Sequence, residues 1–185
     1  MKPRWYPINQ FKNDCISQSL YACLQDKGSF TRHLEQYCKG QLRLELISQR
    51  WKKPLWHESR KLRLRQGEFA LVREIYIKCN NTPWVYARSI IPRKTLRGAQ
   101  RRLVNLGARS LGSFLFSKQS VTRDEIEVVS IQKDDKLFAL ANKITTENSE
   151  NLWGRRSIFY IKEKPLLVIE IFLPAGAKCI NTSNK

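Results

Sequence analysis

The clearest pattern along the chain is a pair of segments in which apolar side chains recur at every second position. These segments are residues 68–79 and 84–91, and both show the period of two that is typical of a β-strand. Asn80 and Asn81 stand between them and suit the positive-φ positions of a two-residue type I′ turn. The sequence therefore predicts a β-hairpin.

The same reasoning predicts the remaining elements. Apolar residues at helical spacing indicate three helices, the last of which is closed by Gly107: residues 14–24, 31–38 and 95–106. Alternation indicates further strands: residues 42–46, 123–131, 157–162 and 166–173, the last two joined by a turn at Glu163-Lys164. Between these elements we expect connections of three kinds: a basic link at 50–65, a short helix at 137–140 and a polar loop at 142–151. Strands grouped in hairpins, with helices set apart, predict an α+β fold with a single antiparallel sheet flanked by helices.

Two arginines interrupt the apolar faces of the predicted hairpin. Counted outward from a two-residue turn, Arg73 lies opposite Arg88. Directly opposed like charges destabilise a sheet, and buried charges need partners, so this pair requires an acidic side chain or a bound anion. Pro83 beside the turn leaves open a turn one residue longer, which would separate the two arginines. The alternative is an ordinary pair of arginines whose guanidinium groups reach a solvated edge.

One carboxylate lies inside the apolar run near the C-terminus. On a strand, Glu170 shares its face with Leu166, Val168 and Phe172, so we expect it to be buried against the core or a cavity. Burial raises the pKa of a glutamate, whereas neighbouring arginines lower it. The sequence leaves two interpretations open, a catalytic carboxylate and a structural ion pair with arginine.

These features occur together in a known family, which the chain resembles over residues 29–175. The blocks that carry the resemblance lie in the family's order: Val72-Arg73-Glu74-Ile75, Ala87-Arg88-Ser89-Ile90-Ile91-Pro92, Ser110-Leu111-Gly112, Thr122-Arg123-Asp124, Trp153-Gly154-Arg155-Arg156-Ser157 and Lys164-Pro165-Leu166-Leu167. The family is chorismate pyruvate-lyase, and the chain is most similar to its plastid and cyanobacterial-type members. The resemblance implies a sheet flanked by helices that encloses an internal ligand cavity.

The resemblance also implies an activity and a set of site residues. Family members split chorismate into 4-hydroxybenzoate and pyruvate, and the product serves plastoquinone or ubiquinone synthesis. Arg73 and Glu170 would contact the aromatic product, Arg88 would bind charged groups of the substrate, the backbone at Leu111 would be a further contact, and Phe30 would close over the ligand. Two features depart from the family pattern: Ser113 stands where some relatives have arginine, and residues 130–151 replace a shorter link.

The chemistry of chorismate fits this set of residues. Chorismate carries two carboxylates, so its site needs two fixed cations, and arginine grips a carboxylate through a planar fork. We expect Arg73 and Arg88 to supply them, and Glu170 to act as an acid or hydrogen-bonding partner at the ring oxygen. The chain contains no phosphate-binding loop, nucleophile elbow or zinc-type cysteine spacing, so we expect no metal and no organic cofactor.

Composition bounds the remaining possibilities. A length of 185 residues fits a single domain, residues 1–185, and no apolar stretch approaches the ~20 residues of a membrane span. Five cysteines, an odd number without a framework, predict reduced thiols in a cytosol-like compartment. The family resemblance implies that this compartment is a plastid stroma or a bacterial cytoplasm. We expect a monomer with chorismate as its small-molecule partner.

The net charge of +18 exceeds what a dianionic substrate requires. It leaves open an association with RNA or with an anionic membrane, although a solvated basic surface explains the charge more simply. A further alternative on the same fold is an aromatic-acid-binding module without turnover, like the effector-binding domains of certain bacterial regulators.

Overall fold

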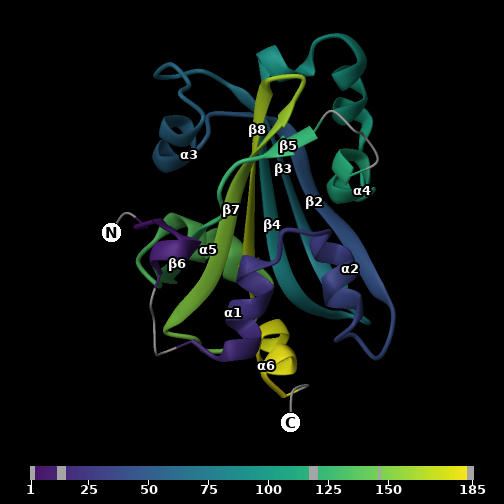
Figure 1. The fold of residues 1–185 in the computed structure, drawn as a ribbon, viewed down its shortest axis with the longest axis vertical. Helices are drawn as coiled ribbons and strands as arrows, with labels where there is room; N and C mark the ends of the chain where they lie inside the picture. The colour runs from purple at the N-terminus through teal and green to yellow at the C-terminus, as the bar shows by residue number, and fades with distance from the viewer. Residues whose placement is uncertain (1–2, 12–15, 117–120, 146, 183–185) are drawn as a thin grey trace.

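An antiparallel sheet forms the centre of the molecule. The computed structural model describes residues 3–11, 16–116, 121–145 and 147–182. The strands follow the order β1-β6-β7-β8-β4-β3-β2, and β5 pairs with β7 (Figure 1). Their bounds are β1 Tyr6–Pro7, β2 Leu42–Lys52, β3 Ala70–Cys79, β4 Thr82–Pro92, β5 Val121–Arg123, β6 Glu127–Gln132, β7 Asn151–Ile161 and β8 Lys164–Phe172. This architecture confirms the predicted α+β fold class.

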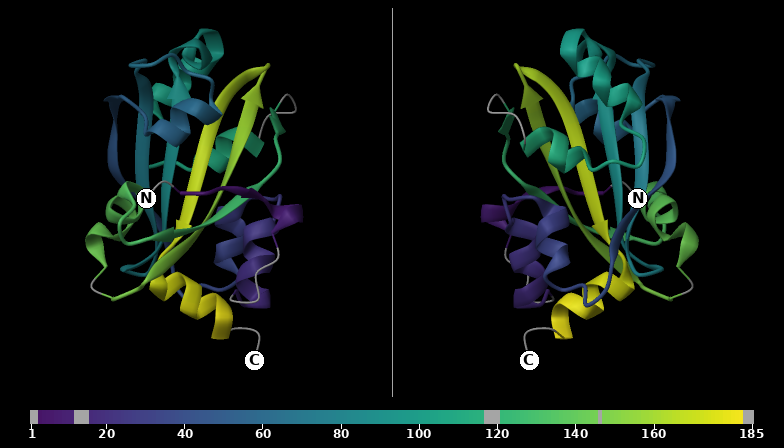
Figure 2. Two further views of the ribbon diagram at one scale, coloured as in Figure 1. Left: turned by 90° about the vertical axis from the view of Figure 1, so that its left-hand side faces the viewer. Right: turned by 90° about the vertical axis from the view of Figure 1, so that its right-hand side faces the viewer.

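Helices cover both faces of the sheet, as Figure 2 shows with α1 and α5 on opposite sides of the strands. The α-helices are α1 Gln18–Gln25, α2 Phe30–Glu35, α3 Trp56–Lys61, α4 Leu111–Phe116, α5 Lys136–Ala141 and α6 Pro174–Thr182. The 3-10 helices are η1 Ile8–Gln10, η2 Arg93–Leu96, η3 Gly98–Asn105 and η4 Asn142–Ile144.

Alternation along the strands divides the core into three clusters. On one face, α1, α2 and α6 bury one cluster, and η2, η3 and α4 bury a second cluster farther along the same strands. On the other face, α5 and the chain around α3 bury the third. Two clusters on one face leave room between them for a site.

The β3–β4 hairpin has the predicted two-residue turn but not the predicted register. Cys79 pairs with Thr82 across Asn80 and Asn81, and Asn80 has a φ of 55°. The register then shifts, because Ile77 pairs with Val85 whereas Lys78 pairs with Pro83, which leaves Trp84 as an extra residue. Such a β-bulge places two residues against one and moves every later side chain to the other face.

Most of the other predicted elements are present, with different bounds. Strand β2 runs to Lys52 and α3 occupies residues 56–61, so the predicted basic link is mostly regular structure. The helix predicted at 95–106 consists of two 3-10 helices, and Gly107 after it has a φ of +58°. The β7–β8 turn lies at Lys162-Glu163, one residue earlier than expected, and β7 begins inside the expected loop. Part of the predicted first helix, residues 14 and 15, lies outside the described residues.

The prediction of reduced thiols was wrong for one pair of cysteines. Cys38 and Cys79 form a disulfide with a Cα–Cα distance of 5.8 Å. They are 41 residues apart in sequence, but the antiparallel pairing of Leu42 with Cys79 brings the chain just before β2 to the end of β3. Cys23 is a buried free thiol.

Candidate active site

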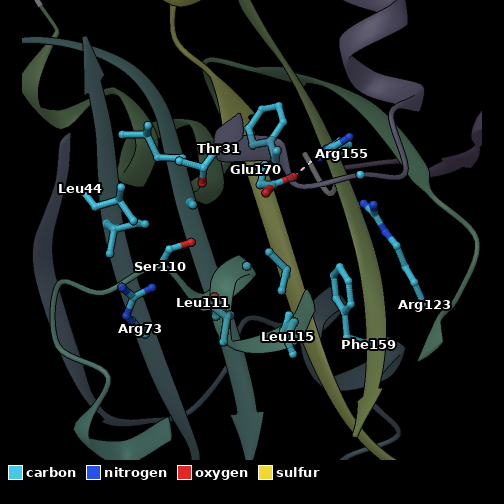
Figure 3. Close-up of a pocket in the computed structure, with 18 residues that line it drawn as sticks. Thr31, Leu44, Arg73, Ser110, Leu111, Leu115, Arg123, Arg155, Phe159 and Glu170 are labelled. Atoms are coloured by element: carbon cyan, nitrogen blue, oxygen red, sulfur yellow. Dashed lines mark hydrogen bonds and ion pairs between the residues drawn. The ribbon is translucent and has the colours of Figure 1, made fainter. Parts of the chain in front are cut away.

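A pocket lies on the sheet face between the two clusters of core residues that share that face (Figure 3). Strands β3, β4, β7 and β8 form its floor, and the chain around α2 and α4 forms its walls. The cavity volume is about 50 Å³, which is smaller than typical small-molecule sites.

Arg73 on β3 is a buried cation without an acidic partner among the described residues. It is 2% exposed, and its Nε and Nη2 donate to the carbonyl oxygen of Gly107 at 3.1 and 3.0 Å. Nη2 also donates to the carbonyl of Arg109 at 2.8 Å. Burial lowers the pKa of Arg73 to about 10, so its guanidinium remains charged at neutral pH. The loop after η3 thus fixes this guanidinium in the pocket wall.

Glu170 on β8 is held by Arg155 on the neighbouring strand β7. Their backbones pair directly, and Arg155 Nε donates to Glu170 Oε2 at 2.6 Å. Nη1 of Arg155 donates to the carbonyls of Cys23 and Asp26 at 3.0 and 2.6 Å. The Arg155 guanidinium also lies 4.2 Å from the ring centroid of Phe30. Arg155 therefore connects the pocket carboxylate to the chain between α1 and α2.

Arg123 on β5 reaches the same end of the pocket. Its Nε donates to the hydroxyl of Ser157 at 3.0 Å, and its guanidinium lies 5.0 Å from the ring centroid of Phe159. Burial, together with nearby Arg155, lowers the pKa of Arg123 to about 10. Among the described residues no carboxylate lies within ion-pair distance of it.

The charges of the pocket do not cancel. Among the described residues that line it are three guanidinium groups, those of Arg73, Arg123 and Arg155, and the single carboxylate of Glu170, which leaves a formal charge of +2 on these residues. Figure 3 shows Arg73 at one end and Arg123 and Arg155 at the other. Since buried charge requires compensation, this pocket favours a ligand with two negative charges.

The prediction that Arg88 faces Arg73 was wrong. Because of the bulge at Trp84, Arg73 pairs with Ser89, and Arg88 pairs with Glu74 on the opposite face of the sheet. There Arg88 contacts both oxygens of Glu58, at 2.7 and 3.2 Å, and Glu74 at 2.9 Å. Two glutamates therefore satisfy Arg88, and it is not among the residues that line the pocket.

Known proteins are similar to this sequence over most of its length. The family model for chorismate lyase matches residues 2–179. A probable chorismate pyruvate-lyase from Nitrosospira multiformis is 35% identical over 92% of this chain and 93% of that protein. Another, from Coxiella burnetii, is 34% identical over 92% of this chain and 91% of its own length. The chain belongs to the chorismate lyase family. These relatives are bacterial, and they do not support the plastid assignment.

Solved structures with much lower sequence identity share the fold. The effector domain of PhnF from Mycobacterium smegmatis has a TM-score of 0.57 and 11% identity, and the match covers 80% of this chain and 90% of that one. The ligand-binding domain of a putative GntR-family regulator from Bordetella bronchiseptica has a TM-score of 0.52 and 18% identity, covering 74% and 86%. At these identities the likeness concerns the fold alone.

Of the other residues that the sequence of this chorismate lyase family member pointed to, some line the pocket and some lie outside it. Phe30 and Leu111 line the pocket. Ser113 lies in a neighbouring surface hollow. Residues 130–151 contain the end of β6, α5 and η4, and α5 packs on the opposite face of the sheet.

Sequence reasoning missed two of the pocket arginines as site residues. Arg123 and Arg155 stood in the Thr122-Arg123-Asp124 and Trp153–Ser157 blocks that carried the family resemblance, but no apolar alternation marked either as facing a cavity.

Within the described residues, no cluster of three or more His, Cys, Asp or Glu side chains is placed to hold a metal ion. No helix in this part of the chain has the length and apolar character needed to cross a bilayer.

Proposed function

We propose that this chain is a chorismate pyruvate-lyase, which cleaves chorismate to 4-hydroxybenzoate and pyruvate and so supplies the aromatic precursor of a quinone. The observation that carries the proposal is the excess of two positive charges in a buried pocket of a chorismate lyase family member. Chorismate is a dianion, so it would neutralise this excess. The names of the relatives, probable chorismate pyruvate-lyases, agree with the proposal.

Arg73 binds the ring carboxylate in this proposal. Its guanidinium is held by two backbone carbonyls, so it is oriented before the ligand arrives. A preorganised arginine fork binds a carboxylate about twice as strongly as neutral hydrogen-bonding groups do. The backbone of Leu111, at the start of α4 and in the pocket lining, supplies a further contact to the same end of the ligand.

Glu170 lies toward the other end of the pocket, where the ring hydroxyl would be. One oxygen of Glu170 accepts from Arg155, which leaves its second oxygen to accept a hydrogen bond from the ring hydroxyl. This ion pair supports the hydrogen-bonding role of Glu170 over the role of proton donor. Arg155 positions the carboxylate, since its own contacts anchor it to the C-terminal end of α1 and to Asp26, which follows α1.

The reaction needs little covalent help from the protein. The ether bond between the ring and the enolpyruvyl oxygen breaks, the neighbouring ring carbon loses its proton, and the electron pair of that C–H bond completes the aromatic ring. The departing enolate of pyruvate gains a proton, so atoms and charges balance. Holding both ends of the ring aligns the breaking bonds, and the arginines stabilise the negative charge that develops on the leaving oxygen.

Apolar side chains complete the site around the ring. Phe30 is 5% exposed and contacts Phe172 edge to face, with the two ring centroids 5.4 Å apart. Together with Leu115 and Phe159, Phe30 gives the aromatic ring of the product an apolar wall. The same wall excludes water, which strengthens the electrostatic contacts inside.

Release of both products from chorismate tests the proposal. The purified protein should form pyruvate and 4-hydroxybenzoate in equal amounts, and Arg73→Ala and Glu170→Ala should lose most of the rate. Arg101→Gln, at an exposed position on η3, is a matched control. Spontaneous breakdown of chorismate is measured without protein. If the wild type binds 4-hydroxybenzoate but releases neither product, the chain is a binding module on the enzyme's fold and the proposal is wrong.

A further inference from the structure

The proposed reaction leaves one group of the substrate unassigned. If Arg73 holds the ring carboxylate and Glu170 the ring hydroxyl, the enolpyruvyl side chain lies beside Glu170, because chorismate carries the ether and the hydroxyl on neighbouring ring carbons. Its carboxylate therefore needs a cation at the Glu170 end of the pocket. Arg88 is excluded, since it lies on the other face of the sheet.

Arg155 is the first candidate at that end, but its Nε and Nη1 groups are occupied and its charge is paired. Nε is bonded to Glu170, and Nη1 is bonded to the carbonyls of Cys23 and Asp26. The residue is 1% exposed, and its charge is already balanced by Glu170. Arg155 is therefore a positioning residue for Glu170.

Arg123 has the complementary properties. Ser157 fixes its Nε at 3.0 Å, and the ring of Phe159 lies 5.0 Å beneath it, so the fork is oriented. Nη1 makes only a 3.2 Å contact to the carbonyl of Lys27 and a 3.4 Å contact to that of Asp26. No described group accepts a hydrogen bond from Nη2. Arg123 also lines the pocket without a carboxylate partner among the described residues.

The arrangement in Figure 3 places these groups in the order that the substrate requires. Arg73 lies at one end, Glu170 lies toward the other, and Arg123 lies beyond Phe159 on the side of Glu170. We propose that Arg123 binds the carboxylate of the enolpyruvyl side chain and makes the site selective for a dianion over an aromatic monocarboxylate. This inference rests on the proposed function.

Ligands with one and with two carboxylates distinguish a specific role of Arg123 from a general effect on the pocket. The ring carboxylate is present in chorismate and in 4-hydroxybenzoate, whereas the second carboxylate leaves with pyruvate. Arg73→Gln should therefore weaken the binding of both ligands. Arg123→Gln should lower kcat/KM for chorismate by about tenfold or more, the value of one charge-assisted contact, with KM carrying most of the change. It should alter the Kd of 4-hydroxybenzoate by less than about threefold, since the remaining contacts are intact.

A stable dianion sharpens the test. The probe is 3-(carboxymethoxy)-4-hydroxybenzoate, which retains both carboxylates and cannot undergo the elimination. Titration calorimetry with this probe and with 4-hydroxybenzoate, on wild type and Arg123→Gln, closes a thermodynamic cycle. We expect the variant to lose about tenfold in affinity for the probe alone. Arg123→Lys should recover part of the loss because the cation remains, and it serves as the second variant if Arg123→Gln folds poorly. Arg101→Gln controls for the change in net charge.

Two results would overturn the inference: an equal loss for both ligands, which would mean that Arg123 only supports the pocket, or an unchanged kcat/KM for chorismate. Either result is distinguishable from failure of the proposed function, because in that case the wild type itself would release no pyruvate from chorismate.

Discussion

Replacement of Arg88 by methionine should destabilise the protein without disabling its site. Arg88 lies on the face of the sheet opposite the pocket, between two buried carboxylates. Burial alone would lower the pKa of Arg88, but Glu58 and Glu74 raise it above its ordinary value. Methionine retains the length of the aliphatic stem and removes the charge.

The magnitude follows from what the two glutamates would retain. Glu74 would keep Lys52 at 2.6 Å and the hydroxyl of Tyr86 at 2.6 Å. Glu58 is fully buried and, among the described groups, would keep only the backbone N–H of Leu55, at 2.7 Å. Breaking a buried ion pair from one side costs about 3–5 kcal/mol, which for a chain of this size lowers Tm by roughly 6–20 °C.

Urea unfolding measures the loss of stability, and steady-state kinetics on the same samples measure KM for chorismate. We expect the loss of unfolding free energy stated above, with KM for chorismate within about twofold of wild type at a temperature where the variant is folded. Arg43→Met, at an exposed position on β2, is the matched control and should change stability by less than about 0.5 kcal/mol. Adding Glu58→Gln should restore part of the loss, because it removes the unpaired charge. A large rise in KM with unchanged stability would instead show that Arg88 contacts the substrate.

Three further predictions concern other parts of the molecule. Burial, with Arg156 and Arg88 nearby, lowers the pKa of His57 from 6.5 to about 4. Neutral His57 therefore contributes about 3 kcal/mol to the unfolding free energy above pH 6.5, and this contribution is lost as the pH falls toward 4. His57→Asn should flatten the pH dependence of the unfolding free energy across that interval. Reduction of the Cys38–Cys79 disulfide, which closes a loop of 41 residues, should lower the unfolding free energy by about 4 kcal/mol. Urea titrations with and without dithiothreitol measure this difference, and the unfolding free energy of Cys38→Ser should not depend on dithiothreitol. Phe30→Leu should speed the release of 4-hydroxybenzoate by about three- to tenfold in stopped-flow fluorescence, because it removes the aromatic contacts to Phe172 and Arg155, and an unchanged rate would exclude Phe30 as a cover.

Local patterns in the sequence predicted much of the fold. Runs of apolar residues identified the central strands. These strands are largely buried, so the polar residues within them, Arg73 and Glu170, stood out as candidates for the site. Gly107 marked the end of the segment after β4, and its positive φ explains the choice of glycine. The structure places Arg73, Glu170, Phe30 and Leu111 around one pocket.

The errors came from features that local patterns do not encode. A single bulged residue, Trp84, sends Arg88 to the other face, and no repeat of apolar positions reveals such an insertion. The roles of Arg123 and Arg155 depend on pairing between β5, β7 and β8, which brings together residues that lie far apart along the chain. The disulfide depends in the same way on the pairing of β2 with β3.

In the proposed site, Arg73 binds one end of the ligand and Glu170 lies toward the other. A crystal structure of the protein with 4-hydroxybenzoate would show this orientation. We expect the carboxylate of the ligand within hydrogen-bonding distance of Arg73, its hydroxyl at Glu170 and its ring against Phe30. A ligand bound in the reverse orientation, or bound on the face that carries Arg88, would show that the proposed site is wrong.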